Sequence, residues 1–183
     1  TLAISIYCYM LWIGMRLIDK GPVNLSVYAP KLFISSIFVT VLVCLTIISG
    51  GFVAGLDAGL TYNTFPLMDG DFVPDGLWNE NPWYKNFFEN VTTVQFNHRL
   101  LAKITLIFVI LNWWVSNRMA IPPSIKRPLN FMLVMAFLQF TLGVITLVFI
   151  VPVLIASLHQ LGALILLTFS LWAVYRLKFM KKN

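Results

Sequence analysis

Long apolar stretches separated by shorter polar segments make up most of the chain. A helix needs about 20 residues to cross the hydrocarbon core of a bilayer. Helices are expected there because lipid offers no partner to backbone N–H and C=O groups. Five stretches are candidates: Leu2–Ile18, Leu32–Ala54, Val91–Val115, Leu129–Ile150 and Val153–Leu177. The first is short, as expected of the end of a helix that begins upstream of Thr1.

The composition agrees with a chain whose solvent is lipid. Hydrophobic residues make up 59% of the 183 positions and charged residues 11%, whereas a soluble domain carries roughly a quarter charged residues. The formal net charge is +6, but the basic residues fall in short clusters beside the apolar stretches and form no continuous basic face. We therefore expect the positions of the basic residues to indicate which side of the membrane each polar segment occupies. Because no continuous basic face is present, we exclude a nucleic-acid-binding protein.

The polar segments differ in length and charge. Asp19–Lys31 and Asn117–Pro128 are short and basic, and Val151–Pro152 is a minimal turn that makes the last two stretches an antiparallel hairpin. The long loop, Asp57–Asn90, holds six of the seven acidic residues: Asp57, Asp69, Asp71, Asp75, Glu80 and Glu89. Its aromatic content is too high for a disordered tether, so we expect it to fold over the site described below.

The basic residues indicate the orientation of the chain in the membrane. Ten of the thirteen fall on the side opposite the long loop: Arg16, Lys20, Lys31, Arg118, Lys126, Arg127, Arg176, Lys178, Lys181 and Lys182. Because basic residues concentrate on the cytoplasmic side, this side is predicted to face the bacterial cytoplasm or the mitochondrial matrix. The long loop then faces the periplasm or the intermembrane space, and residues 178–183 form a basic tail on the inner side.

The two histidines lie at matched depths in two of the apolar stretches. His98 is about eight residues into the third stretch and His159 about seven into the fifth, which places both on the order of 10–12 Å below the outer surface. The two stretches run in the same direction, and each histidine begins an H-x-L-x-A pattern that ends at Ala102 or Ala163. The alanine at i+4 shares the histidine's helix face and leaves room for a flat macrocycle. We predict that His98 and His159 are the axial ligands of one haem iron.

Two other interpretations of the histidines are open. They could be unrelated core residues bonded to neighbouring carbonyls, although polar residues at such depth are biased towards function. A catalytic zinc site would need a third protein ligand, and no Cys, Asp or Glu lies at that depth.

Nearby residues carry weaker expectations. Gly162 and the small-residue pattern Gly51–Gly55 are expected to give room beside the ligands. Asp57 is expected as a solvated helix end, or as a functional group at the outer interface. Arg99 is expected either to neutralise a haem carboxylate or to reach lipid headgroups. Asn90 is expected as the N-cap of the third stretch.

Two long motifs resemble a known family. The stretch SGGFVAGLDAGLTYNTFPLMDGDFVP and the later PWYKNFFENVTTVQFNHR closely resemble haem A synthase in its alphaproteobacterial and mitochondrial form, and LHQ around His159 resembles that family's second C-terminal histidine motif. The resemblance covers essentially the whole chain.

The resemblance implies an all-α, polytopic membrane fold. The family has two similar four-helix halves, each with a histidine pair on its second and fourth helices. Residues 32–177 resemble the complete C-terminal half, an up-down four-helix bundle with His98 and His159 as its pair. Residues 1–18 resemble the end of the last helix of the N-terminal half.

The resemblance also implies an oxidoreductase activity and its partners. The family oxidises a methyl group of haem O to a formyl group, giving haem A for haem-copper terminal oxidases. Haem O synthase supplies the substrate, and a ferredoxin-type protein donates electrons in the mitochondrial case. Self-association into a homo-oligomer is left open.

One departure from the family pattern bears on the division of labour. A glutamate three residues before the first histidine is implicated in catalysis in the N-terminal half, and this position here is Gln95. An amide cannot act as a general base. We therefore expect this segment to hold a haem b that relays electrons and to contain no catalytic residue. A b-type cytochrome subunit, or a haem-binding transport or chaperone module, remains the alternative.

Overall fold

The structure, a computed structural model, describes residues 2–18, 23–25 and 29–182. Five α-helices account for most of them: α1 (Leu2–Ile18), α2 (Pro30–Gly55), α3 (Val91–Asn117), α4 (Pro123–Val148) and α5 (Val153–Lys178). Two short 3-10 helices, η1 (Ala58–Leu60) and η2 (Trp83–Phe87), lie in the long loop. The predicted all-α class is confirmed.

Four helices, α2 to α5, are long and apolar enough to cross a membrane, and α1 is a shorter apolar helix. The predicted bounds hold within a few residues except in α4, which begins at Pro123 instead of Leu129 and contains Pro128. Proline at the first helical position has no N–H to leave unpaired and a φ already suited to a helix, as at Pro30 of α2 and Pro123 of α4. The chain is a multi-pass membrane protein.

One short β pairing was not predicted. Strands β1 (Val23–Leu25) and β2 (Met180–Lys182) pair in parallel and join the segment before α2 to the segment after α5. Lys178, predicted to begin a tail, is the last residue of α5. Lys20, one of the predicted inner-side residues, lies outside the described residues.

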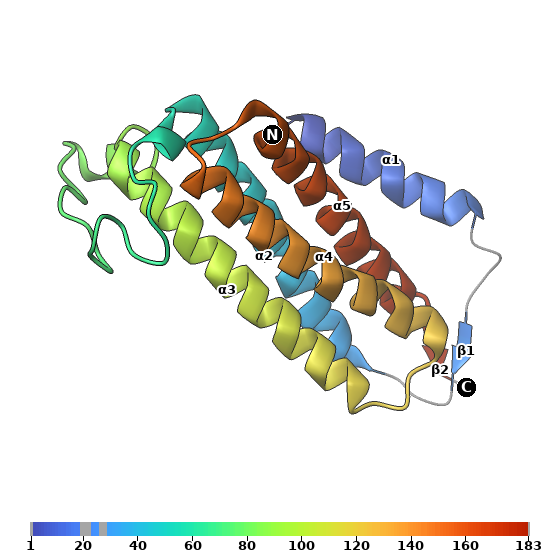
Figure 1. Ribbon diagram of the computed structural model, residues 1–183. Helices are drawn as coiled ribbons and strands as arrows, with labels where there is room; N and C mark the ends of the chain where they lie inside the picture. Colours follow the sequence, from blue (N-terminus) through green and yellow to red (C-terminus); the bar gives the residue numbers. More distant parts are fainter. Residues whose placement is uncertain (1, 19–22, 26–28, 183) are drawn as a thin grey trace.

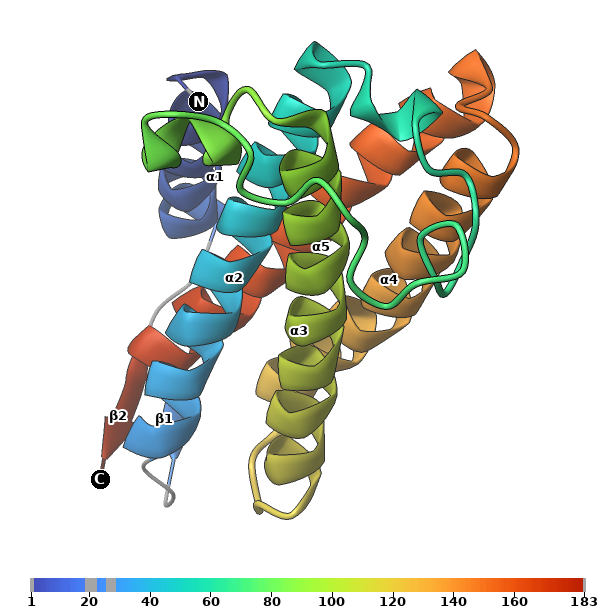
Figure 2. The ribbon, with the colours of Figure 1, turned by 90° about the vertical axis from the view of Figure 1, so that its left-hand side faces the viewer.

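Helices α2 to α5 form an up-down bundle in which each helix packs against two neighbours (Figure 1). α2 and α4 both pack against α3 and α5, so α3 and α5 occupy opposite corners. Both run away from the end of the bundle that carries the long loop, here called the loop end (Figure 2). α1 lies outside the bundle against α5, where the Trp12 and Tyr175 rings meet edge to face with centroids 5.3 Å apart.

The apolar core is concentrated in the half of the bundle away from the loop end. Its fully buried members come from the beginning of α2 and α4 and from the later parts of α3 and α5: Leu32, Val39, Val43, Val109, Ile125, Leu129, Met132, Leu167 and Ala173. Within this core, the Asn112 amide bridges two serines of α2: it accepts from Ser35 Oγ at 2.6 Å and donates to Ser36 Oγ at 3.1 Å. The bundle is thus tightly packed at one end, which leaves the loop end for a site.

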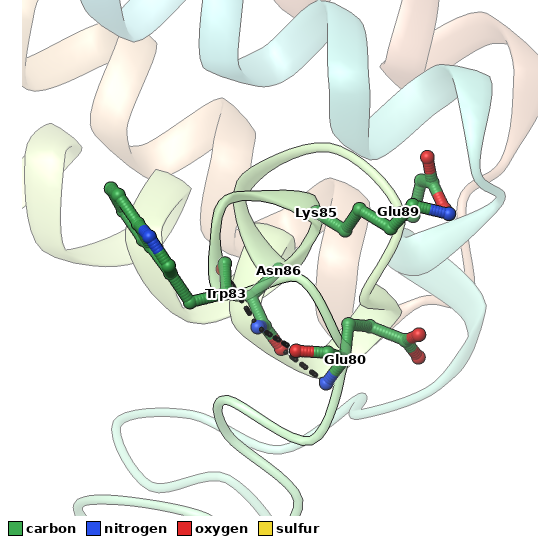
Figure 3. A network of polar contacts seen from close by, with 5 residues as sticks. All are labelled: Glu80, Trp83, Lys85, Asn86 and Glu89. Carbon is green, nitrogen blue, oxygen red and sulfur yellow. Dashed lines mark hydrogen bonds and ion pairs between the residues drawn. The ribbon is translucent and has the colours of Figure 1, made fainter.

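The long loop has its own polar framework (Figure 3). The fully buried Asn86 accepts a hydrogen bond from the Glu80 N–H at 2.9 Å and donates to the carbonyls of Glu80 and Trp83 at 3.0 and 2.8 Å. Asn90 accepts from the Thr93 N–H at 2.9 Å, which confirms it as the N-cap of α3, and donates to the Gly76 carbonyl at 3.0 Å. The last part of the loop is therefore fixed to the first turn of α3.

Asn86→Ala should loosen this part of the loop. Each buried polar group left without a partner costs about 1–3 kcal/mol, so proteolytic cleavage within residues 76–90 should be faster by roughly tenfold or more. Limited proteolysis of the protein in lipid nanodiscs measures this. Glu89→Gln is the control because it removes only the exposed Lys85–Glu89 ion pair (3.3 Å), which is worth about 0–1 kcal/mol. Equal cleavage rates for the two variants would contradict the role of Asn86.

Candidate functional site

A cavity of about 920 Å³ lies inside the bundle towards its loop end. Its walls come mainly from α2, α3, α4 and α5, with Ile4 of α1 and Val151 of the α4–α5 turn. The long loop contributes Asp57, Gly59, Leu60 and Phe65. Both histidines line it, one from α3 and one from α5. The volume is in the upper part of the range of small-molecule and cofactor sites, and the largely apolar lining is typical of them.

The His98 ring lies against α2. A Cβ added at Gly50 would come within 3.0 Å of the ring's Cε1 atom, so only glycine leaves the ring undisturbed there. Ser49 Oγ lies 2.8 Å from His98 Nδ1 and donates to the Thr46 carbonyl at 2.8 Å. Because a hydroxyl has one proton, Ser49 accepts from Nδ1–H, and Nε2 keeps a free lone pair. This is the tautomer that binds a metal through Nε2.

The His159 ring lies against α4 in the same way. A Cβ at Gly143 would come within 2.8 Å of its Cε1 atom. Its polar partner differs: the Gln139 amide nitrogen lies 3.0 Å from His159 Nδ1 and donates to the His159 carbonyl at 2.7 Å. An amide nitrogen only donates, so this contact is a hydrogen bond when Nδ1 is the unprotonated ring nitrogen and Nε2 carries the proton.

The Gln139 amide has a spare acceptor for the other tautomer. Its Oε1 atom is buried and has no hydrogen-bond partner among the described residues. Metal binding through His159 Nε2 would require Nδ1–H, and Oε1 is the atom that rotation of the amide could present to it. Gly162, expected to give room to the macrocycle, instead gives room to Gln139: an added Cβ there would collide with Oε1.

The other expected small residues fall into two groups. Ala102 and Ala163 line the cavity as predicted, and so does Gly51. At Gly51 and Gly55, however, an added Cβ would meet nothing within 4 Å, so no helix approaches closely there. The glycines that contact the rings are Gly50 and Gly143, which no sequence pattern singles out.

Arg99 and Gln95 of α3 bind the long loop. The Arg99 guanidinium donates to the carbonyls of Tyr62 (2.6 Å), Thr64 (2.8 Å) and Leu67 (3.3 Å). The Gln95 amide, 2% exposed, donates to the carbonyls of Ala58 (2.8 Å) and Tyr62 (3.1 Å). We call residues 58–67 the strap. In this structure the Arg99 donors thus bind the strap, where a haem carboxylate or lipid headgroups were expected.

The strap also reaches α4. The Asn63 amide donates to the Leu147 carbonyl at 2.9 Å. The Phe65 ring packs edge to face on Phe140, with centroids 6.0 Å apart, and Lys103 Nζ lies 5.8 Å from the Phe65 centroid on the α3 side. Figure 2 shows the loop descending between α3 and α4. The strap therefore closes the α3–α4 side of the cavity, whereas the rest of the long loop, apart from Asp57, does not line it.

Two further expectations concern the loop end and metal ions. Asp57 follows the end of α2 with a left-handed backbone (φ 50°) and an exposed side chain. Aspartate tolerates this conformation better than most residues, in keeping with a solvated helix end, and it also lines the cavity. Among the described residues, no group of three or more His, Cys, Asp or Glu is arranged to hold a metal ion.

Substitutions of three glycines should test whether the ring contacts matter. Gly143→Ala, and to a lesser extent Gly50→Ala, should displace an imidazole and lower the haem content and the low-spin haem absorbance of the purified protein. Gly51→Ala is the matched control on α2, because its Cβ would meet nothing within 4 Å. Full haem content in Gly143→Ala, or an equal loss in Gly51→Ala, would contradict the packing argument.

Comparisons with known proteins agree with the resemblance. Residues 1–171 match the family model COX15-CtaA, cytochrome oxidase assembly protein. The heme A synthase of Nitrosospira multiformis is 43% identical over 178 residues, which cover 97% of this chain and 50% of that protein. The heme A synthases COX15 of Arabidopsis thaliana and Homo sapiens are 42% and 37% identical, over 93% and 96% of this chain and 38% and 43% of those proteins.

The chain thus spans half or less of the length of these relatives. No solved structure matches it. The match to the family model covers nearly the whole of the bundle, including both histidines and the long loop. The chain therefore belongs to the cytochrome oxidase assembly protein family.

Proposed function

We propose that this chain is the haem-holding part of a heme A synthase, which binds haem b between His98 and His159 and relays electrons to a reaction carried out elsewhere in the protein. The observation that carries the proposal is the pair of imidazoles from two parallel helices at opposite corners of one bundle, both lining one apolar cavity. Haem bound there would supply reversible one-electron chemistry at its iron.

The residues of the chain fit this group. His98 offers Nε2 with a free lone pair, because Ser49 accepts from Nδ1–H. Gly50 and Gly143 keep both rings in place without crowding. Axial imidazoles on both faces would leave no open position on the iron, which favours electron transfer over activation of a small ligand. The apolar lining and the strap would limit the access of water.

The structural role of Gln95 supports a relay without local catalysis. Its amide nitrogen donates to two strap carbonyls, Ala58 and Tyr62. An ionised glutamate only accepts hydrogen bonds and could make neither contact. Glutamine at this position thus stabilises the closed strap and provides no general base.

The wider reaction follows from the names of the relatives and from the family resemblance. We propose that the whole protein oxidises a haem O methyl group to a formyl group, with haem O supplied by haem O synthase and electrons supplied by a ferredoxin-type donor. We also propose that the long loop faces the periplasm or intermembrane space and that the opposite end, which carries the basic residues, faces the cytoplasm or matrix.

Removal of either axial ligand should abolish the low-spin spectrum of this site. His98→Ala and His159→Ala should each give five-coordinate haem or lose haem, because among the described residues no other His and no Met or Cys lines the cavity. Added imidazole should restore the low-spin spectrum in both, which separates a missing ligand from a misfolded bundle. A normal low-spin spectrum at this site in either variant would refute the pairing. A b-type cytochrome subunit would give the same spectra but would not convert haem O to haem A in the full-length protein.

Gln95→Leu should leave the axial spectrum intact and reduce haem A formation by well under tenfold, since it only loosens the strap. A general acid–base residue contributes about 10²–10⁴-fold. Conversion of haem O in membranes containing the full-length protein measures the effect. A loss of a hundredfold or more at unchanged haem content would show that this position takes part in the chemistry.

A further inference from the structure

Lys103 places a positive charge near the middle of a membrane-spanning helix. It lies about as far from Val91 as from Asn117, the two ends of α3, and it is half-buried and lines the cavity. Ionisable side chains at such depth are costly, and they usually face a partner or a functional cavity. Lys103 therefore needs an explanation that an ordinary lipid-facing or core position does not provide.

The contacts of Lys103 leave its ammonium group without an anion. Its Nζ lies 5.8 Å from the centroid of the Phe65 ring. Among the described residues, the one side-chain ion pair is Lys85–Glu89 in the long loop, and Lys103 takes part in none. Arg99, one turn away on the same face of α3, differs because its terminal nitrogens already donate to strap carbonyls.

The ammonium group points towards the level of the histidines. Side chains of an α-helix lean towards its N-terminus, which in α3 is the loop end. The contact with Phe65 agrees, since Phe65 belongs to the strap that Arg99 holds. Lys103 thus directs its charge back along the cavity wall towards the level of His98. Among the described residues that line the cavity, Asp57 is the one acidic residue. It follows the last turn of α2 at the loop end and forms no ion pair with Lys103.

We infer that Lys103 binds a carboxylate at the edge of the tetrapyrrole held between His98 and His159. The inference rests on the proposed haem site. An ammonium in an apolar cavity is stabilised by an ionised partner that accepts a charge-assisted hydrogen bond, and the edge carboxylates are the acidic groups that haem carries. Two axial bonds alone leave a flat ring free to rotate about the line between the imidazoles. A carboxylate bound to Lys103 would fix which edge faces the strap side.

The test compares haem b with its dimethyl ester, which has the same ring and iron but no carboxylate charge. Haem-free, full-length protein in nanodiscs is loaded with each compound, and the rate of haem loss to an excess of apomyoglobin is measured. Wild type should retain haem b better than the ester by about tenfold or more, as expected of a hydrogen bond to a charged group. Lys103→Gln should lose this preference, and Lys103→Arg should keep most of it.

Controls and outcomes separate this inference from the proposed function. Lys85→Gln removes a cation from the long loop and should behave as wild type. If wild type shows no preference for haem b, or if Lys103→Gln keeps the full preference with a normal low-spin spectrum, the assignment of Lys103 is wrong and the haem site stands. If wild type gives no bis-imidazole spectrum with either compound, the proposed site fails and the inference fails with it.

Discussion

The contact between an imidazole and a glycine of the neighbouring helix is the constraint on which the site depends. A histidine inside a membrane span has few partners, and its ring must be held in one orientation to be useful as a ligand. Gly50 supports His98 and Gly143 supports His159, each from the helix that precedes the histidine in the chain. An added Cβ would lie 2.8 Å from the His159 ring at Gly143 and 3.0 Å from the His98 ring at Gly50, so each ring packs closely against the backbone of the neighbouring helix.

The site also depends on how large and small side chains are distributed along the bundle. Large aliphatic side chains such as Leu129 and Leu167 fill the half away from the loop end. Towards the loop end, small residues such as Ala102 and Ala163 replace them and leave a cavity. The tightly packed half holds the helices together next to the cavity. Rigidity at one end therefore permits open space at the other.

The strap solves a second problem, the placement of irregular backbone against membrane-spanning helices. Unpaired carbonyls are costly wherever water is scarce, so non-helical segments at such depth need protein partners. Arg99 and Gln95 donate to strap carbonyls from α3, and Asn63 of the strap donates to a carbonyl of α4. The strap is thus bound by hydrogen bonds on both sides of the seam that Phe65 fills. Arg99 and Gln95, which the sequence marks as candidates for a functional role, thus stabilise the wall of the site in this structure.

Much of the architecture could be predicted from the sequence because the relevant signals are local. Apolar length located the spans, and the Asn90 position before Val91 identified the N-cap. The glycine contacts could not be found in this way, since they join residues far apart in the chain, such as Gly50 and His98. The pattern did show consecutive glycines at 50 and 51, but only their rotation about the α2 axis decides which one meets the ring. The strap partners of Arg99 could not be predicted for a similar reason: they lie in a loop whose path has no periodic signal.

The two histidine rings differ in the polar group that contacts Nδ1: the Ser49 hydroxyl for His98 and the Gln139 amide for His159. Ser49 has given its one proton to Thr46, so His98 is held in the tautomer suited to iron. Gln139 can be donor or acceptor, and in this structure it donates to His159 while its oxygen has no partner among the described residues. Under the proposed function, iron would bind His98 through Nε2 in the tautomer that Ser49 favours. Binding through Nε2 of His159 would require a proton on Nδ1, the atom that lies 3.0 Å from the Gln139 amide nitrogen. After rotation of the Gln139 amide, its Oε1 atom would accept a hydrogen bond from Nδ1–H. This would also remove the free-energy cost of a buried acceptor that has no hydrogen bond.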